Sequence, residues 1–362
     1  MMTLILNNEE IEKILTMEAC LEVLEHLYRE YGQGRTVDLP RSDAVVPSST
    51  DYTVYALKTM SGCVPYFGKA AIRLNSDTIQ HPTIDGIKRR VKVPAASGGK
   101  WVGLVLLFDM NSGEPVAIFP DGVVQRMRVA ATNGLGAKYL SRKDSRILAL
   151  IGSGWQAGSQ AMAFSAVRDL KEIRVYSPNK EHRESFCKEM EPKLKVKMIP
   201  ATSTAMAIDE ADIIASATSS MVPVLKKEWL KPGIHVSAIK VQEVSWEVIT
   251  GCNVFFLHSN RFLKQTNYLM ESEKRSYIEV EKGWWVEKAE EILVNKRFPD
   301  LGDLVTGKFP GRTSADQTTG FLNSLGLGIQ FAAVGAKVYE MALEKGLGRE
   351  IPTDWFLETV HP

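Results

Sequence analysis

The chain has 362 residues, with 44 Lys and Arg against 43 Asp and Glu, so its net charge at pH 7 is +1. A protein that binds polyanions gathers a surplus of Lys and Arg on one face, so this balance excludes nucleic acid or an anionic membrane as the expected partner. Hydrophobic residues make up 44% of the chain, which is typical of a globular protein, and the length allows about two domains.

The four cysteines, Cys20, Cys63, Cys187 and Cys252, lie far apart and form no CxxC pair. No histidine stands at metal-ligand spacing from them, so we expect reduced thiols, no metal site and a cytoplasmic protein. The first residues lack the basic and apolar regions of a signal peptide. No apolar run approaches the ~18 residues of a membrane-spanning helix, so we expect no membrane partner.

The N-terminal residues predict a strand and then a helix. Residues 3–6 are mainly apolar, Asn7 and Asn8 are candidate helix caps, and apolar residues then recur at helical spacing. Gly32 and Gly34 end this pattern, so we expect an amphipathic helical start.

A β-rich layer is predicted between Val37 and Pro120, because short apolar segments alternate there with turn signals such as Ser-Gly-Gly at 97–99. This pattern favours a mixed sheet. The same region contains a local concentration of positive charge at Lys88, Arg89, Arg90 and Lys92. Two interpretations stay open for these cations: a solvated hairpin arm, or an anion-attracting flap over a site.

From about Arg126 to Val305 the pattern predicts a doubly wound α/β domain. Near-continuous apolar runs alternate with helix-length segments, as they do where parallel strands are buried on both faces. The predicted strands span residues 146–151, 172–176, 195–199, 212–216, 235–239 and 253–257. After Gly307, a loop leads to a long apolar helix over 318–348, which we expect to cross back onto the N-terminal layer.

A dinucleotide site is predicted in this domain, at the run Gly152-Ser153-Gly154-Trp155-Gln156-Ala157. The run follows a predicted strand and opens a helix, which is the context that the G-x-G-x-x-G/A fingerprint requires. Gly152 makes the tight turn, Gly154 lets the backbone approach the pyrophosphate, and Ala157 allows close helix packing. The pyrophosphate then lies at the helix N-terminus, where free N–H groups favour anions.

The end of the second strand predicts which dinucleotide is bound. NAD-selective sites carry an acidic residue there, which binds the ribose 2′-hydroxyl and repels a 2′-phosphate. This chain has no carboxylate from Val175 to Lys180, whereas Ser177 and Asn179 can bond a phosphate. Lys180 or Arg183 can neutralise that phosphate, so we favour NADP(H). The alternative is NAD(H), with both cations as solvated helix charges.

Several segments resemble the ornithine cyclodeaminase/mu-crystallin family: 127–132 followed by GAKYLS, the glycine-rich loop, ATSS at 217–220 followed by Pro223, and GRTSADQTTGFLNSLGLGIQ at 311–330. The resemblance covers nearly the whole chain, in the right order. It implies a Rossmann domain with a doubly wound parallel sheet at 126–317, and an α+β substrate-binding and dimerisation domain made of 1–125 and 318–362. Family members are typically homodimers that move hydride between a nicotinamide and the α-carbon of an amino acid or its imine.

Carried over by position, Arg41, Lys69 and Arg128 resemble the substrate-carboxylate cluster of the family. Guanidinium groups bind a carboxylate bidentately, and a lysine adds a point charge. The resemblance therefore implies a small anionic amino or imino acid as the substrate, with Lys69 also a candidate catalytic residue.

The resemblance also places two further segments at the cofactor. ATSS is expected below the nicotinamide, where Thr218, Ser219 and Ser220 face its carboxamide or ribose. Ala238 and Ile239 end a predicted strand at the carboxyl edge of the sheet, where Rossmann ligands lie, so we expect them to contact the cofactor as well.

The chain departs from the cyclodeaminases after its fifth parallel strand. Where they usually carry Gly-Gly-Asp, this sequence has Gln242 at the position of the acidic group, and Gln cannot ionise. Lys240 and Glu243 are the ionisable candidates in that loop. Glu243 either acts as acid and base toward the substrate nitrogen or forms a structural salt bridge with Lys240. Val129 follows Arg128 where the family has Thr, which indicates an altered substrate pocket.

These observations predict an NADPH-dependent reductase of α-imino acids, or an amino-acid dehydrogenase in the reverse direction. Arg41, Lys69 and Arg128 hold the carboxylate, and Lys240, Glu243 or water protonates the imine nitrogen. The first alternative is an ornithine cyclodeaminase, which converts ornithine into proline and ammonia with bound NAD. The second is a noncatalytic NADP-binding protein, like the lens crystallin of the family.

Overall fold

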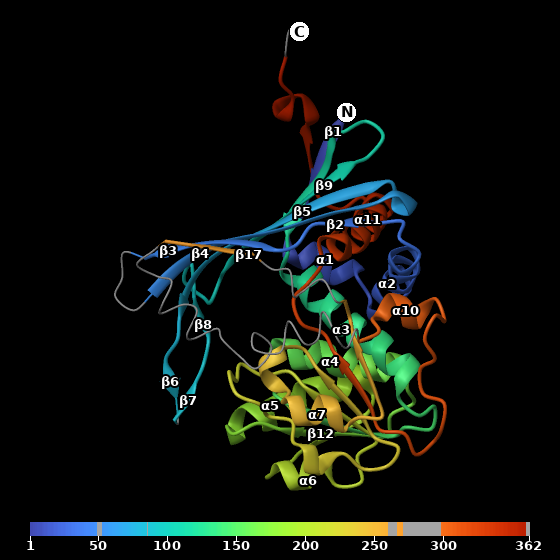
Figure 1. Ribbon diagram of the computed structural model, residues 1–362. Coiled ribbons are helices and arrows are strands. Elements are labelled where there is room, and N and C mark those ends of the chain that lie inside the picture. The colour runs from blue at the N-terminus through green and yellow to red at the C-terminus, as the bar shows by residue number, and fades with distance from the viewer. Residues whose placement is uncertain (49–52, 85, 260–265, 271–297, 360–362) are drawn as a thin grey trace.

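The computed structural model describes residues 1–48, 53–84, 86–259, 266–270 and 298–359. Two sheets form its framework: a ten-stranded sheet that carries both termini, and a seven-stranded sheet at the opposite end of the molecule (Figure 1). Helices α1, α2, α3 and α11 lie between the two sheets (Figure 1). The predicted combination of an α/β Rossmann domain with a second, mixed-sheet domain is confirmed.

The large sheet has the strand order β17-β3-β4-β5-β9-β10-β1-β19, with β2 paired to β4 and β8 paired to β5. It is mixed, because β1 pairs parallel with β10 and β17 parallel with β3, whereas the central strands are antiparallel. The 3-10 turn η1 (Pro65–Phe67) joins β4 to β5. The strands are β1 (Met2–Ile5), β2 (Val37–Asp38), β3 (Ser42–Pro47), β4 (Thr53–Val64), β5 (Lys69–Gln80), β8 (Val91–Val93), β9 (Val102–Asp109), β10 (Pro115–Pro120), β17 (Thr266–Leu269) and β19 (Arg349–Pro352).

The helical start predicted for the N-terminus consists of two helices, α1 (Asn8–Ile14) and α2 (Met17–Gly32). Asn7 caps α1 in a capping box with Glu10, as its polar side chain before an apolar run predicts. The sequence pattern runs on without a break, but the chain leaves the helical conformation at Leu15, and Thr16 caps α2. A cap residue inside an apolar pattern therefore divides what periodicity alone predicts as one helix.

Helix α11 (Gly328–Lys345) packs against β4 and β5, so the predicted return of the C-terminal helix to the N-terminal layer is confirmed. Two glycines make the approach close: a Cβ on Gly62 would lie 2.4 Å from the backbone nitrogen of Ile329, and one on Gly328 would lie 2.2 Å from the carbonyl carbon of Ser61. Neither α11 nor any other helix among the described residues is long and apolar enough to cross a membrane.

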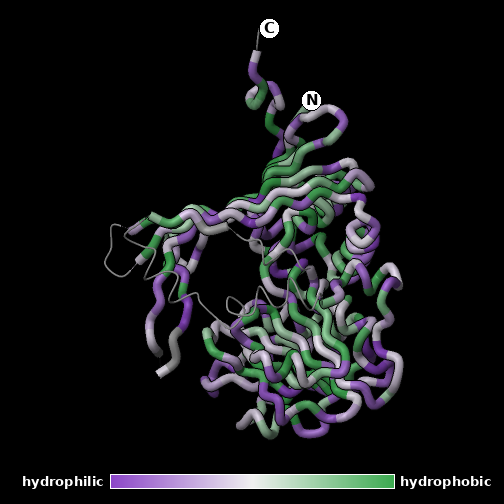
Figure 2. Tube along the Cα trace, in the orientation of Figure 1, coloured by the Kyte–Doolittle hydropathy of each residue, from purple (hydrophilic) through white to green (hydrophobic). Residues whose placement is uncertain are grey.

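The second sheet is wholly parallel, in the order β13-β12-β11-β14-β15-β18-β16. Every residue of β14, β15 and β18 is buried, and Figure 2 shows hydrophobic residues along this sheet. The strands are β11 (Ile147–Ile151), β12 (Glu172–Tyr176), β13 (Lys197–Pro200), β14 (Ile213–Ser216), β15 (His235–Ala238), β16 (Val254–Leu257) and β18 (Thr319–Leu322). The helices of this part are α3 (Gly122–Leu140), α4 (Trp155–Val167), α5 (Lys180–Leu194), α6 (Thr204–Ile208), α7 (Trp246–Gly251) and α10 (Leu301–Val305), with 3-10 turns η2 (Lys227–Trp229) and η3 (Val241–Glu243).

Two strands change the predicted division of the chain. β18 lies in the segment predicted as helix, yet it pairs with β15 and β16 in the Rossmann sheet. β17 lies in the segment predicted as Rossmann domain, yet it pairs with β3 of the large sheet. Relative to the predicted boundary, the Rossmann domain therefore gains residues 319–322, and the second domain gains residues 266–269. The prediction misses both strands because a strand of four residues has no periodicity that distinguishes it from a helix or a loop.

A narrow arm, formed by β6 (Thr83–Ile84), β7 (Ile87–Lys88) and β8, descends from the large sheet beside the Rossmann domain (Figure 1). It is predominantly hydrophilic (Figure 2). Arg89 of this arm forms an isolated antiparallel bridge with Ser220 of the Rossmann domain. Of the cations predicted as an arm or a flap, Arg89 therefore reaches the other domain.

Candidate active site

The glycine-rich loop between β11 and α4 has the geometry of a dinucleotide site. Gly152 has φ +123°, and a Cβ there would lie 2.2 Å from the carbonyl oxygen of Ala217, so the position requires glycine. Gly154 is the N-cap residue of α4, and a Cβ on it would meet no atom within 4 Å. No side chain at Gly154 therefore covers the first N–H groups of α4, so a pyrophosphate can approach them.

The ATSS segment lies beside this loop, and Glu243 holds it there. The Glu243 carboxylate accepts hydrogen bonds from the backbone N–H and the hydroxyl of Thr218, at 2.5 and 2.7 Å, and from the N–H of Ile239 at 3.3 Å. Burial raises the pKa of Glu243, whereas the charge of Lys240 and these donors lower it. Lys240 itself donates to the carbonyl oxygen of Ser220 at 2.6 Å.

These contacts bear on the two roles considered for Glu243. Its side chain is 0% exposed and joins the loop after β14 to the loop after β15. The contacts favour a positioning role for Glu243, and Lys240 supports the same loop through Ser220. Proton donation to a substrate nitrogen stays a prediction for both residues.

At the end of β12, most residues predicted for the 2′-phosphate are engaged within the protein. Ser177 accepts a hydrogen bond from the Ser153 hydroxyl at 2.9 Å, and Asn179 caps α5 with its side-chain oxygen. Arg183 is buried and donates to the carbonyl oxygen of Ser177 at 3.0 Å, so it braces the loop from inside. Lys180, the first residue of α5, lies 3.9 Å from Glu184, and its side chain is 71% exposed, so this cation is accessible from solvent.

The other residues predicted at the cofactor surround these loops. Trp155 is exposed, and the guanidinium carbon of Arg126 lies 4.7 Å from its ring centroid. The amide oxygen of Gln156 is buried without a hydrogen-bond partner in the described chain. Ala157 and Ala238 are buried, as small residues that allow close packing.

A band of charged residues crosses the inner face of the large sheet. Asp43 of β3 lies opposite Lys58 of β4, and Lys58 lies opposite Asn75 of β5, so the three share one face of the pleat. Arg41 forms a bidentate ion pair with Asp43, with N–O distances of 2.7 and 2.5 Å. Lys58 donates to Asp77 at 2.7 Å. These ionic groups are largely buried, so the band is a built polar site.

Two arginines complete the band where α3 and α11 meet the sheet. Arg73 of β5 pairs with Asp121 at 2.7 Å, and Arg128 of α3 donates to the amide oxygen of Gln330 at 3.0 Å. Both guanidinium carbons lie over the ring of Phe331, at 5.5 and 5.1 Å from its centroid. Burial, with the charge of Arg73, lowers the pKa of Arg128 to about 9. Within the described chain no carboxylate pairs with Arg128, so its charge is available to an anionic ligand.

Lys58 has a strongly lowered pKa. Burial, with the charges of Arg90 and Arg41, lowers it from 10.5 to about 7, although Asp77 opposes the change. A lysine with this pKa exchanges its proton near neutral pH, which is what general acid–base catalysis requires.

Helix α3 and the arm bring the charged band next to the cofactor loops. Arg126, which stacks on Trp155, stands two residues before Arg128 on the same helix. From the arm, Arg89 donates to the hydroxyl of Ser219 at 3.3 Å. Helix α3 and the arm therefore each have residues in contact with the band and residues in contact with the cofactor loops.

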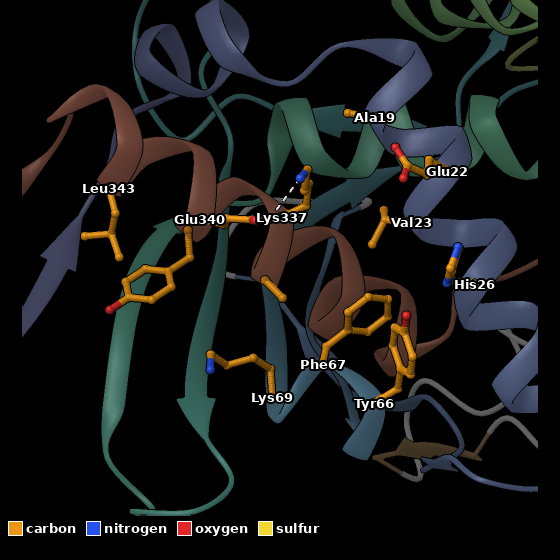
Figure 3. Close-up of a pocket in the computed structure, with 12 residues that line it drawn as sticks. Ala19, Glu22, Val23, His26, Tyr66, Phe67, Lys69, Lys337, Glu340 and Leu343 are labelled. Atoms are coloured by element: carbon orange, nitrogen blue, oxygen red, sulfur yellow. Dashed lines mark hydrogen bonds and ion pairs between the residues drawn. The ribbon is translucent and has the colours of Figure 1, made fainter.

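Lys69, the lysine predicted for the carboxylate cluster, lies elsewhere. It begins β5, four residues before Arg73 and so about 13 Å along the strand. Its ammonium pairs with Asp109 at 2.8 Å, and its side chain lines a cavity of about 450 Å³ between α2, η1 and α11 (Figure 3). Neither Arg41 nor Arg128 lines this cavity. Lys69 is therefore replaced as the candidate by Lys58, the lysine that lies with Arg41.

The sequence patterns do not single out Lys58, Arg73, Asp121 or Gln330. Lys58 and Arg73 stand at inward-facing positions of alternating strands, and Gln330 stands in an apolar helix. A buried polar residue is more informative than an exposed one, so a charged residue on the apolar face of a predicted strand is the signal that identifies Lys58 and Arg73.

Comparisons with known proteins identify the family of the chain. The profile of the ornithine cyclodeaminase/mu-crystallin family matches residues 90–346. A Delta(1)-pyrroline-2-carboxylate reductase of Bacillus cereus is 31% identical over 255 residues, which are 69% of this chain and 74% of that protein. An alanine dehydrogenase of Archaeoglobus fulgidus is 26% identical over 358 residues, which are 97% of this chain and 98% of that protein.

Solved structures show the same fold. The Delta(1)-pyrroline-2-carboxylate reductase of Thermococcus litoralis, in complex with NADH and L-proline, has a TM-score of 0.77 and 24% identity, over 96% of this chain and 100% of that one. An archaeal alanine dehydrogenase dimer with bound NAD has a TM-score of 0.75 and 24% identity, over 97% and 99% of the two chains. Since the family profile covers more than half of the sequence, the chain belongs to the ornithine cyclodeaminase/mu-crystallin family.

Proposed function

We propose that the protein is an NAD(P)H-dependent oxidoreductase that reduces the C=N bond of an α-imino acid or, in reverse, oxidises the CH–NH group of an α-amino acid. The observation that carries this proposal is Arg128, a buried cation next to the cofactor loops that no carboxylate of the described chain neutralises. An α-imino acid brings the carboxylate that this guanidinium can bind. The related pyrroline-2-carboxylate reductase and alanine dehydrogenase support the same class of reaction.

In the proposed reaction, Arg128 and Arg41 bind the α-carboxylate, and Arg73 adds positive charge beside them. Fixing the carboxylate orients the α-carbon, which alone can contribute several kcal/mol to catalysis. Lys58 gives its proton to the imine nitrogen, which makes the carbon of the C=N bond a better hydride acceptor. The reduced nicotinamide, when bound, supplies the hydride. Amine formation therefore consumes one hydride at carbon and one proton at nitrogen.

We favour NADP(H) over NAD(H) as the cofactor. Support comes from the loop after β12, which has no carboxylate to repel a 2′-phosphate and which carries the exposed cation Lys180. The N-terminus of α5 adds free N–H groups at the same loop. Dissociation constants for NADPH and NADH, measured by fluorescence titration, test this preference.

We also propose a homodimer in which the outer faces of the two large sheets meet. That face exposes the apolar side chains of Leu57, Ile72 and Leu104, which lie on the adjacent strands β4, β5 and β9. An apolar patch of this kind marks an interaction surface. Light scattering should give a monomer for the double variant L57E/I72E, and an unchanged dimer would contradict the interface. A cytoplasmic location is in keeping with the four free cysteines.

The two alternatives receive less support. A cyclodeaminase is expected to carry an acidic group where Gln242 stands, and the carboxylate of the neighbouring Glu243 is buried among backbone donors. Lys58 has a pKa of about 7 and lies near other cations. A noncatalytic cofactor-binding protein does not require such a lysine.

The test is oxidation of NADPH or NADH by the purified protein with cyclic ketimines, and with 2-oxo acids plus amines. We expect turnover with at least one of them. Arg128→Gln should lower kcat/KM by about 100-fold or more, because the substrate carboxylate loses its buried cationic partner. Lys138→Gln, which removes an exposed cation from the same helix, should change kcat/KM little. No turnover with any imine or amino acid would contradict the proposal.

A further inference from the structure

The buried guanidinium of Arg128 lies against neutral groups from one short segment of the chain. Its Nη1 donates to the side-chain oxygen of Gln330 at 3.0 Å, and its central carbon lies 5.1 Å from the centroid of the Phe331 ring. A Cβ on Gly326 would lie 2.6 Å from that carbon and from both terminal nitrogens, so the guanidinium packs directly on the backbone there. These contacts all come from residues 326–331, where the loop after β18 leads into α11.

The hydrogen bonds of Gln330 determine which end of its amide faces the arginine. The hydroxyl of Thr132 donates to the backbone carbonyl of Arg128 at 2.7 Å, so it accepts the hydrogen bond that joins it to Gln330 at 2.8 Å. The amide nitrogen therefore points to Thr132, and it also donates to the Tyr28 hydroxyl at 2.9 Å. The amide oxygen accepts from Arg128 and from the N–H of Leu327, each at 3.0 Å. Both hydrogens and both lone pairs of the amide are used, so the amide has one favoured orientation.

A neutral amide at this position leaves the charge of the arginine for a ligand. A glutamate there would form an ion pair with Arg128, as Asp43 and Asp121 do with the other two arginines of the band. The Nε of Arg128 has no hydrogen-bond partner among the described residues, so the guanidinium keeps a free donor. Burial of an unpaired charged donor is unfavourable, and a carboxylate ligand would pair with it.

The ring of Phe331 stabilises two positive charges at one place. The guanidinium carbons of Arg73 and Arg128 lie 5.5 and 5.1 Å from its centroid. Burial lowers the pKa of Arg128, and the charge of Arg73 lowers it further, so the two cations repel each other. An aromatic face attracts a cation through its π-electrons and carries no net charge. The ring therefore holds both guanidinium groups without neutralising either of them.

The loop before α11 reaches the arginine through an unfavourable backbone conformation. Leu325 has φ +58°, which residues other than glycine seldom adopt, and the next residue is Gly326, on which the guanidinium lies. Earlier in the loop, Asn323 donates to the backbone carbonyl of Val129 at 3.0 Å, which ties the loop to the helix that carries Arg128. A strained residue held in place by its surroundings is typical of a functional site.

We propose that Gly326, Gln330 and Phe331 are positioning residues of the substrate site, which hold the guanidinium of Arg128 in place and leave its charge for the α-carboxylate of the substrate. The inference rests on the proposed function, because it explains how the same site keeps a buried cation ready for that carboxylate. The three residues act through Arg128 and not on the reacting atoms. The C-terminal segment thereby takes part in substrate binding without a contact to the substrate of its own.

Two ligands of nearly equal shape test the positioning role. Pyrrole-2-carboxylate and pyrrole-2-carboxamide are planar, like a cyclic imino acid, and differ in the charge of the group that would meet Arg128. In calorimetry with NADP+ present, the wild type should bind the carboxylate tighter than the carboxamide by about tenfold or more. Gln330→Glu, which places a competing carboxylate beside Arg128, should reduce this ratio by about tenfold. Phe331→Leu and Gly326→Ala should each reduce it by about threefold or more.

A matched control separates positioning from packing. Phe119→Leu removes an equally buried ring from the same hydrophobic core and should keep the wild-type ratio. Thermal melting shows which variants are folded, and Phe331→Leu keeps an apolar side chain, so the test does not depend on the other two. A wild-type ratio in every folded variant, or an equal loss in Phe119→Leu, overturns the positioning role and leaves the proposed function standing. Equal binding of both ligands by the wild type, or binding of neither, contradicts the carboxylate site and the proposed function with it.

Discussion

A change of pH around 7 should switch Lys58 between its two protonation states. Burial, with the charges of Arg90 and Arg41, lowers its pKa from 10.5 to about 7. This difference corresponds to about 5 kcal/mol against the charged form, at about 1.4 kcal/mol for each pH unit. The unfolded chain holds the proton more tightly, so the contribution of Lys58 to the unfolding free energy should be most unfavourable below pH 7 and should improve as the pH rises toward 10.5.

The two directions of the reaction should then depend on pH in opposite ways. Imine reduction needs protonated Lys58, so kcat/KM should fall about tenfold for each pH unit above 7. Oxidation of the amino acid needs neutral Lys58 as the base, so kcat/KM should increase about tenfold for each pH unit as the pH rises to 7, and should level off above pH 7. The absorbance of the reduced nicotinamide, followed at saturating cofactor in both directions, measures both profiles.

Substitution of the lysine separates its charge from its proton. Lys58→Arg keeps the charge but cannot lose a proton near neutrality, so kcat should fall by about 100-fold or more and the limb near pH 7 should disappear. Lys69→Arg, in the separate cavity, should keep both profiles. If kcat/KM changed with pH in the same direction for imine reduction and for amino-acid oxidation, proton transfer by Lys58 would be refuted. Lys58 would then be a charge that binds the carboxylate. A wild-type profile without any limb near pH 7 would refute the lowered pKa.

Three further predictions concern the cofactor loops. Gly152→Ala should lower the unfolding free energy, measured in urea, by about 3 kcal/mol or more, because its Cβ would overlap a carbonyl oxygen at positive φ. Gly154→Ala should have the stability of the wild type but weaken NADPH binding by about tenfold or more. Equal stability of the two variants would contradict this geometry. Ser177→Asp should shift the preference from NADPH toward NADH by about tenfold or more in titrations, and an unchanged preference would place the 2′-phosphate elsewhere. Glu243→Gln should cost about 1–3 kcal/mol of unfolding free energy and raise the KM for NADPH, whereas loss of kcat alone would indicate direct catalysis.

The Rossmann domain could be predicted because its signals are local. Parallel strands buried on both faces are continuous apolar runs, and the turn from β11 into α4 is encoded by Gly152 and Gly154 at fixed spacing. β17 and β18 could not be predicted, since each has four residues and owes its place to pairing with strands far away in the sequence. The fold class therefore follows from the sequence, whereas the domain boundary does not.

The substrate side of the site depends on pairings that the sequence does not determine. Lys58 and Lys69 both stand on the inner face of the β4–β5 hairpin, and only the register, in which Lys58 pairs with Asn75 and Val64 with Lys69, shows that they lie at opposite ends. Lys58 thereby meets Asp77, whereas Lys69 meets a different carboxylate. Composition and motif spacing contain no information on this register, so a choice between the two lysines needs the structure.

Helix α3 joins the two halves of the site. Arg126 stacks on Trp155 of the dinucleotide loop, whereas Arg128, two residues later, points to another side of the helix and donates to Gln330 of α11. One buried helix therefore contacts both the dinucleotide loop and the charged band, and hydride transfer requires that the proposed cofactor and substrate be precisely oriented toward each other.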